Sequence, residues 1–407
     1  MRHELQTMLL LPLLVLTQLH CATPSPSAEK APQAANPSQL VAEAAAIIER
    51  ESLDAARADG SPAPAAVSRD VATIEEAHAA IRDLLAKLQA PSERLLSPSQ
   101  AAALIGEVSG AEGVGVGLPE LLSVDVDEKT HLLTVVTPLP DSPAARAGLK
   151  PWDILEAIDG RPTQGLWLEQ AADLLRGPAG TRLVLTVRRG ETVFPVSLTR
   201  EHRKRWTRPV RWKVEQVGSY AVGVLAFDFF YAGVGAEVRE AAKHLQEARV
   251  DGLVLDLRGN PGGQVQECLE IAGLFLGDVP LALLAGRKGP PTELRAQGVT
   301  ATMRQPLVVL VDEGTASAAE LLAGALEAHG RAVLIGARTF GKGRVHASFP
   351  LKDGSMLLLT VARVRTPAGR DLLDEALVPS VHMASEEGAP GTDANYQQAL
   401  QWLVKGQ

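Results

Sequence analysis

The sequence predicts an α/β fold, because short apolar strands alternate with helical stretches through its second half. Apolar runs such as residues 221–226, 252–258 and 306–311 each precede a stretch with apolar positions at helical spacing. Residues 40–110 show helical spacing alone, and residues 112–200 show short strands separated by turn residues. We therefore expect an α/β core preceded by a helical segment and a small strand-rich domain.

Composition fits a globular chain of two or three domains. The chain has 407 residues, of which 46% are hydrophobic and 22% charged, enough apolar material for a sizeable core. The net charge of −8 gives no reason to expect nucleic-acid binding. A basic run at residues 200–211 is interpreted as a solvated connector between domains, with contact to a membrane surface or an acidic partner as the alternative.

The first residues indicate export. Residues 1–22 carry an apolar run that is too short to span a bilayer and fits a signal peptide. Cys21 and the Ala/Pro/Ser-rich residues after it resemble the lipidated cysteine of bacterial lipoproteins, with ordinary cleavage nearby as the alternative. We expect a periplasmic or envelope-anchored protein, with membrane association through a lipidated Cys21 left open. Cys268 is interpreted as a buried thiol on an apolar helix.

The remaining segments follow in order. Residues 23–70 form a tether and a helix, and residues 71–110 are helical with a break at Pro91. In residues 111–200 we expect strands at 113–118, 132–136, 152–158 and 182–188, and helices at 142–148 and 166–175. The core at residues 201–385 contains helices at 234–247, 265–276 and 317–328, and further strands at 332–335 and 356–364. Residues 386–407 end in a short amphipathic helix.

Two stretches carry candidate chemistry. In Gly314-Thr-Ala-Ser-Ala-Ala-Glu320, Ser317 lies at a strand-to-helix turn, beside unpaired backbone N–H groups that stabilise negative charge on a reacting oxygen. A capping box of Ser317 and Glu320 explains the same residues without chemistry. A nucleophilic serine needs a base, and the lysine of Phe340-Gly-Lys-Gly343 can serve if it is buried and uncharged. A solvated surface lysine is the alternative.

These stretches, with Asp256-Leu-Arg-Gly-Asn-Pro-Gly-Gly263, resemble the C-terminal processing peptidases, or tail-specific proteases, over roughly residues 75–385. The resemblance implies a crotonase/ClpP-like α/β protease core. It also implies a Ser317–Lys342 dyad and oxyanion donors at Gly263 and Ala318, with Asp256 and Arg258 fixing their loop by a charged hydrogen bond. His346 stands where the family has a glutamine that orients the lysine, and neutral imidazole can accept the same hydrogen bond.

Residues 111–200 resemble a PDZ domain, inserted into or preceding the core, through Pro138-Leu-Pro-Asp-Ser-Pro-Ala-Ala-Arg-Ala-Gly148 and Ile158-Asp-Gly160. This implies that a peptide carboxylate is bound by backbone N–H groups in the stretch Gly113, Val114, Gly115 and Val116. A glycine-rich turn is the alternative. Trp152 stands where that family usually has a glycine.

The sequence therefore predicts an exported serine endopeptidase that binds unfolded or C-terminal protein tails and hydrolyses peptide bonds. The alternative is a catalytically lapsed PDZ binding or scaffold protein, which His346 favours. A different chemistry on a crotonase-like core is a remoter option. The resemblance implies no metal and no other cofactor. A homo-oligomer, and gating of the core by the PDZ domain across the polar connector, are open hypotheses.

Overall fold

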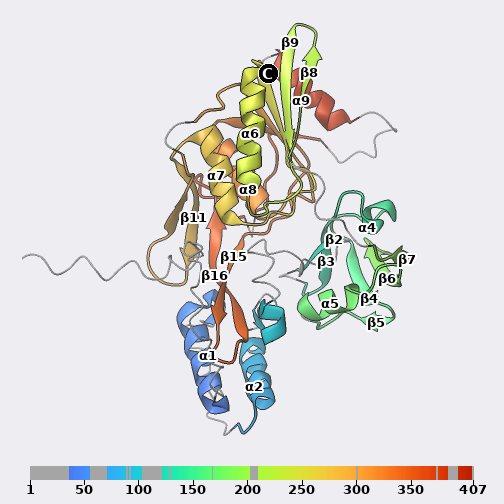
Figure 1. The fold of residues 1–407 in the computed structure, drawn as a ribbon, viewed down its shortest axis with the longest axis vertical. Coiled ribbons are helices and arrows are strands. Elements are labelled where there is room, and N and C mark those ends of the chain that lie inside the picture. Colours follow the sequence, from blue (N-terminus) through green and yellow to red (C-terminus); the bar gives the residue numbers. More distant parts are fainter. Residues whose placement is uncertain are drawn as a thin grey trace, which may run out of the picture.

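A computed structural model describes residues 36–55, 71–88, 90, 93–102, 122–127, 130–166, 168–201, 210–298, 301–372, 375–383 and 393–405. The predicted signal peptide, Cys21 and the stretch from Gly113 to Val116 lie outside these residues. Figure 1 shows a helical region at one end, an α/β core at the other and a small strand-rich domain beside them. None of the described helices combines the length and the apolar character needed to cross a bilayer.

Two helices form the helical region. α1 (Pro37–Glu51) is followed by a short 3-10 turn, η2 (Leu53–Ala55), and α2 (Ile74–Ala86) begins with a capping box of Thr73 and Glu76. Their apolar faces meet in one cluster, which includes Leu40, Ala44, Ile48, Ile81 and Leu85. The predicted helices are therefore present, each held by packing of one apolar face.

A five-stranded antiparallel sheet joins the helical region to the core. Its strands are β1 (Arg94–Leu96), β11 (Pro280–Gly286), β12 (Thr292–Arg295), β15 (Arg344–Pro350) and β16 (Met356–Arg365). Their order is β1-β16-β11-β12, with β15 also paired to β16. β1 lies just after the predicted break at Pro91, and the sequence did not predict this strand, in which Leu95 and Leu96 pair with β16 and bury their side chains.

The small domain, described from residue 122 to 201, is an antiparallel sheet with two short helices. Its strands are β2 (Leu122–Val126), β3 (Leu133–Pro138), β4 (Ile154–Ile158), β5 (Arg161–Pro162), β6 (Arg182–Arg189) and β7 (Thr192–Thr199); its helices are α4 (Pro143–Arg146) and α5 (Leu168–Leu175). The order is β2-β3-β4-β6-β7, with β5 paired to β4, so β2 is an edge strand. The predicted strand at 152–158 begins two residues late, because Trp152 adopts a φ of 69° in the preceding turn.

The core is built on a second six-stranded sheet. Its order is β17 (Val381–His382), β14 (Ala332–Gly336), β13 (Leu307–Val311), β10 (Gly252–Asp256), β9 (Tyr220–Ala226) and β8 (Arg211–Val217). All neighbours are parallel except β8 and β9. Because both faces are covered, the central strands read as continuous apolar runs, which is why the sequence predicts them well.

Helices cover the two faces of this sheet (Figure 1). One face packs against α6 (Val234–Glu247), α7 (Val265–Leu276) and α8 (Ala318–Ala328), and the other packs against α9 (Ala394–Lys405). Alternate residues of each strand supply the two clusters, as the strand period requires. Cys268 on α7 is fully buried as predicted, and burial raises the pKa of its thiol.

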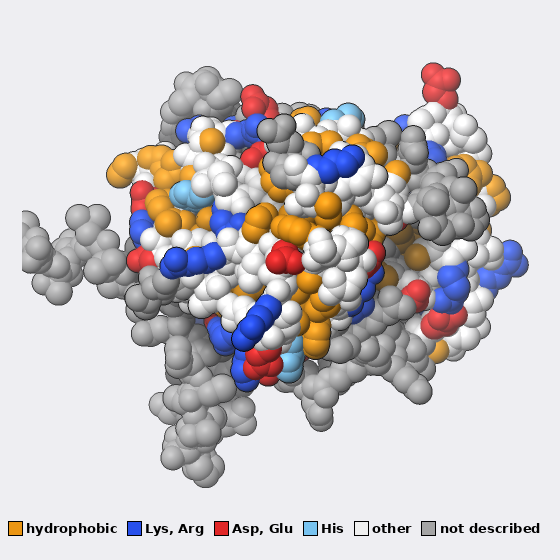
Figure 2. Space-filling view, turned by 90° about the horizontal axis from the view of Figure 1, so that it is seen from above, with side chains coloured by type: hydrophobic (Ala, Val, Ile, Leu, Met, Phe, Trp, Pro, Cys, Tyr) orange, Lys and Arg blue, Asp and Glu red, His pale blue; other side chains and the backbone are white. Residues whose placement is uncertain are grey.

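The edge strand β8 leaves two large apolar side chains in water. Trp212 is 44% exposed and stacks on His244 of α6, and Val214 is 36% exposed. Figure 2 looks onto this end of the molecule and shows apolar side chains between scattered acidic and basic ones. Charged residues interrupt the exposed apolar surface, as they do on strand edges that stay unpaired.

Candidate active site

Three loops carry the predicted site residues and leave the sheet at one edge. We call them the glycine loop (residues 257–264, after β10), the serine loop (312–317, after β13) and the lysine loop (337–343, after β14). These strands are parallel neighbours, so their carboxyl ends meet. Such an edge is where open α/β sheets bind ligands.

Ser317 occupies an unusual backbone conformation at the start of α8. Its φ is 54° and its ψ is −119°, so it does not have the extended conformation of an ordinary helix cap. Positive φ costs a residue with a side chain free energy, and such strain persists where the surroundings impose it. The turn leaves Ser317 partly exposed while Ala316 and Ala318 on either side are buried. Its hydroxyl is thus presented at the loop surface.

Glu320 joins the serine loop to the lysine loop. Its Oε2 accepts the N–H groups of Ser317 and Lys342, each at 2.9 Å. Its Oε1 accepts the Gly341 N–H at 2.7 Å and the Thr339 hydroxyl at 2.5 Å. The backbones of Ser317 and Lys342 therefore each lie one hydrogen bond away from the same oxygen atom.

The carboxylate of Glu320 is fully buried, and burial raises its pKa while the donors around it lower the pKa. The sequence predicts Glu320 only as a capping residue. Its contact with the Ser317 N–H fits that role, but three donors come from the lysine loop, beyond the next strand along the chain. The missed signal was an acidic residue within the otherwise apolar stretch 318–326.

The glycine loop lies against Ser317. A Cβ added to Gly262 would fall 2.8 Å from the Ala318 nitrogen and 2.8 Å from the Ser317 Cβ, so only glycine fits. Gly263 has a φ of 137°, and a side chain there would overlap the Phe230 carbonyl. Within the described part of the chain, the N–H groups of Gly263 and Ala318 have no hydrogen-bond partner.

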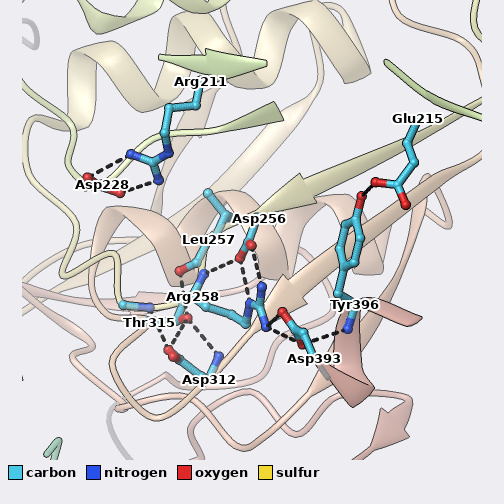
Figure 3. A network of polar contacts seen from close by, with 11 residues as sticks. Arg211, Glu215, Asp228, Asp256, Leu257, Arg258, Asp312, Thr315, Asp393 and Tyr396 are labelled. Carbon is cyan, nitrogen blue, oxygen red and sulfur yellow. Dashed lines mark hydrogen bonds and ion pairs between the residues drawn. The ribbon is translucent and has the colours of Figure 1, made fainter. Parts of the chain in front are cut away.

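Asp256 and Arg258 fix the start of this loop, as predicted. The Arg258 guanidinium donates to both oxygens of Asp256, at 2.9 and 2.6 Å. Its third nitrogen reaches Asp393, the residue before α9, at 2.7 Å (Figure 3). The opposed carboxylates outweigh the effect of burial and raise the pKa of Arg258. The contact with Asp393, far along the chain, had no sequence signal.

The ammonium of Lys342 forms an ion pair with Asp125 of β2, in the small domain. Burial acts to raise the pKa of Asp125, but the charge of Lys342 and its hydrogen bond outweigh burial and lower it. No local pattern predicts this pair, because it joins two domains. It occupies the nitrogen that a general base would need.

The small domain touches all three loops. Trp152 stacks on Phe340 of the lysine loop, with ring centroids 4.2 Å apart and planes inclined by 14°. A Cβ added to Gly314 of the serine loop would lie 3.0 Å from the Thr137 hydroxyl, and Gly259 of the glycine loop packs against the same hydroxyl. The small domain is therefore seated on the candidate site.

His346 on β15 lies beside this cluster. Burial, together with the positive charges of Arg94 and Lys342, lowers its pKa to about 3. Imidazole is therefore neutral at any ordinary pH. Its Nε2 is buried and has no hydrogen-bond partner among the described residues. A neutral acceptor nitrogen without a partner is suited to receive a hydrogen bond from a nearby lysine.

The chain matches two known family models. Residues 221–383 match peptidase family S41, and residues 134–189 match the PDZ domain. The second range spans β3 to β6 of the small domain, and the first spans the core from β9 to β17.

Its relatives match over most of the chain. The carboxyl-terminal-processing protease of Synechocystis sp. is 38% identical over 84% of this chain and 80% of its own length. Carboxyl-terminal-processing peptidase 2, chloroplastic, of Arabidopsis thaliana is 36% identical over 75% of this chain and 60% of its own length. The solved structure of a photosystem II D1 C-terminal processing protease superposes with a TM-score of 0.74 at 29% identity, covering 86% of this chain and 94% of that one.

Proposed function

This chain belongs to peptidase family S41, as a serine-type peptidase with a PDZ domain, and on that premise we propose that it cuts unfolded or C-terminal protein tails with a Ser317–Lys342 dyad. The observation that carries the proposal is that Glu320 accepts hydrogen bonds from the backbone N–H groups of both residues. Burying a carboxylate costs free energy unless hydrogen bonds or an ion pair compensate for the lost hydration. Here those bonds keep a serine and a lysine from two separate loops together.

The mechanism is acyl transfer. Lys342, as a neutral amine, takes the proton of the Ser317 hydroxyl, and the oxygen attacks the peptide carbonyl. The N–H groups of Gly263 and Ala318 bind the oxyanion, and the lysine returns the proton to the leaving amine. Water then attacks the acyl-enzyme, with Lys342 as the base again. His346 accepts a hydrogen bond from the lysine through Nε2 and so orients it.

The contact between Lys342 and Asp125 makes the described arrangement a resting one. A charged, ion-paired lysine cannot take the serine proton, so catalysis requires the PDZ domain to release it. This supports gating of the core by the PDZ domain. It also supports the second candidate function, a protein that binds tails through its PDZ domain while its lysine stays paired.

Substrate tails would enter along β2. This strand is at the edge of the described PDZ sheet, where an extended peptide can add as a further strand, and the predicted carboxylate-binding residues Gly113 to Val116 precede it. Export, lipidation of Cys21 and assembly into a homo-oligomer are further parts of the proposal. They rest on the sequence, and mass determination of the secreted chain and sedimentation test them.

The deciding experiment is cleavage of an unfolded protein with an apolar C-terminus between neutral and mildly alkaline pH. We expect Ser317→Ala and Lys342→Ala to abolish cleavage, His346→Gln to retain it, and Asp125→Asn to raise it. Ser348→Ala and Lys352→Ala are matched controls on the exposed hairpin of β15 and β16. If Ser317→Ala cuts as well as the parent chain, the dyad is wrong. If only Asp125→Asn cuts, the natural chain is a binding protein.

A further inference from the structure

Asp312 is the first residue of the serine loop, directly after β13, and its side chain contacts the glycine loop (Figure 3). Its Oδ1 accepts the Gly259 N–H of the glycine loop at 2.8 Å. The same oxygen accepts the Gly314 N–H of the serine loop at 3.0 Å, and the Thr315 hydroxyl lies 3.1 Å away. One carboxylate oxygen thus contacts polar groups of both loops.

Further contacts continue from this point toward Ser317. The Thr315 hydroxyl accepts the Asp312 N–H and lies 2.9 Å from the Leu257 carbonyl oxygen. One step along, the Ala316 N–H donates to the Asn260 carbonyl at 2.9 Å. The serine loop and the glycine loop are therefore held side by side up to the point where Gly262 packs against Ser317.

Asp312 makes no ion pair within the described part of the chain. The nearest cationic group of this network, Arg258, is bonded to Asp256 and Asp393 instead. Burial raises the pKa of Asp312, and the negative charge of Asp256 raises it further, against hydrogen bonds that lower it. Burying a carboxylate near a second negative charge costs free energy. The hydrogen bonds that Asp312 accepts from the two loops offset that cost.

We propose that Asp312 is a positioning residue for peptide hydrolysis, which sets the spacing between the oxyanion donors of Gly263 and Ala318. It touches no substrate. One donor is on the glycine loop and the other starts α8 behind the serine loop, so their separation depends on how the loops are fastened together. The inference rests on the proposed function, because it presupposes that Ser317 is the nucleophile.

The test compares Asp312→Ala and Asp312→Asn by kcat, KM and affinity for a peptide boronic acid. The serine oxygen donates an electron pair to boron, which becomes a tetrahedral anion with an oxygen in the oxyanion hole. For Asp312→Ala we expect kcat to fall roughly a hundredfold, the effect of losing one oxyanion donor, with KM changed less than about threefold. Boronate affinity should fall in parallel with kcat, a change that a merely structural role would not produce.

Asp312→Asn keeps an acceptor oxygen but loses the charge, so its kcat should fall about tenfold. It also serves if Asp312→Ala fails to fold. The matched control is Asp251→Asn: Asp251 precedes the opposite end of β10 and accepts the Ala221 N–H at 2.8 Å, and we expect its kcat to be unchanged.

Ser317→Ala distinguishes failure of the proposed dyad from failure of the positioning role of Asp312. If that variant still cuts, the proposed dyad fails and the Asp312 experiment loses its premise. If Ser317→Ala is inactive while the folded Asp312 variants keep the parent kcat and boronate affinity, the dyad stands and the positioning role is overturned. A loss in KM alone also overturns it.

Discussion

At the scale of single residues, two carboxylates bind the candidate site in different ways. Glu320 holds the backbones of Ser317 and Lys342, whereas Asp125 holds the lysine side chain. The first carboxylate would hold the proposed dyad together whether or not Asp125 is bound, because its described hydrogen bonds come only from backbone and from Thr339. The second binds the nitrogen that is the base in the proposed mechanism, and it would have to leave before the amine could take a proton.

His346 gives a prediction on pH and stability. Its pKa is about 3 in the fold against 6.5 for the free side chain, so between those values the unfolded chain binds a proton that the folded chain refuses. Stability therefore falls as pH falls through this window. His346→Gln should remove this loss of stability. The variant's unfolding free energy minus that of the parent chain should be about 2 kcal/mol larger at pH 5 than at pH 8.

Urea unfolding of both chains at both pH values measures this double difference. His382→Gln replaces an exposed histidine and is the control, with little difference expected. An equal response of the two variants would show that His346 is as accessible to protons as a surface histidine, and would remove the physical basis for treating it as a neutral acceptor.

Local sequence could predict Ser317, Lys342 and the glycine loop, because each belongs to a contiguous motif at the end of an apolar strand. It could not predict Asp125, whose partner Lys342 lies in another domain. Nor could it predict Asp393, which lies beyond the last strand of the sheet and pairs with Arg258 of the glycine loop. Glu320 is intermediate. Its local capping contact was visible in the sequence, and its contacts to the lysine loop required the parallel pairing of β13 with β14.

At the scale of elements, buried strands were predictable and edge strands were not. β10 and β13 are apolar on both faces and stand out in the sequence. β12 has only exposed or partly exposed side chains and no apolar run. In β15 Val345, Ala347 and Phe349 alternate with other residues, but no apolar run marks the strand and its side chains are largely partly exposed. β2 lacks four or more apolar residues in a row, because Ser123 and Asp125 interrupt it.

The turn before β4 yields a prediction about the PDZ–core contact. Trp152 holds a φ of 69°, which suits glycine, and gains the stack on Phe340 in return. Trp152→Gly should leave stability nearly unchanged, because relief of strain offsets the lost stack. An aromatic stack is worth about 0.5–1.5 kcal/mol, so the fraction of released PDZ domain, and with it basal cleavage, should rise about two- to tenfold.

Basal cleavage of an unfolded protein at equal enzyme concentration measures this effect. Trp212→Ala is the matched control, because Trp212 has nearly the same exposure, 44% against 43%, and a stack with the same 14° inclination, but lies on β8. Basal cleavage that is unchanged in Trp152→Gly, or raised as much in Trp212→Ala, would mean that the stack does not restrain the site.

At the scale of the whole molecule, the PDZ domain is seated against the glycine, serine and lysine loops. A ligand can shift such an arrangement only through a difference in its affinity for the seated and released states. β2 offers a source of that difference, because the strand that would pair with a peptide also carries Asp125, which holds Lys342. We therefore expect a peptide that pairs with β2 to weaken the contact that restrains the lysine.

This coupling predicts that a short apolar peptide with a free carboxylate stimulates cleavage of a separate reporter by the parent chain. In the double variant Asp125→Asn/Trp152→Gly, the equilibrium between the seated and released PDZ domain already favours the released state. Basal cleavage should therefore be higher, and the peptide should stimulate it little or not at all. Reporter hydrolysis as a function of peptide concentration measures both, with the amidated peptide as control. Equal stimulation of the parent and the double variant would place the restraint elsewhere, because a population that is already released cannot be shifted again.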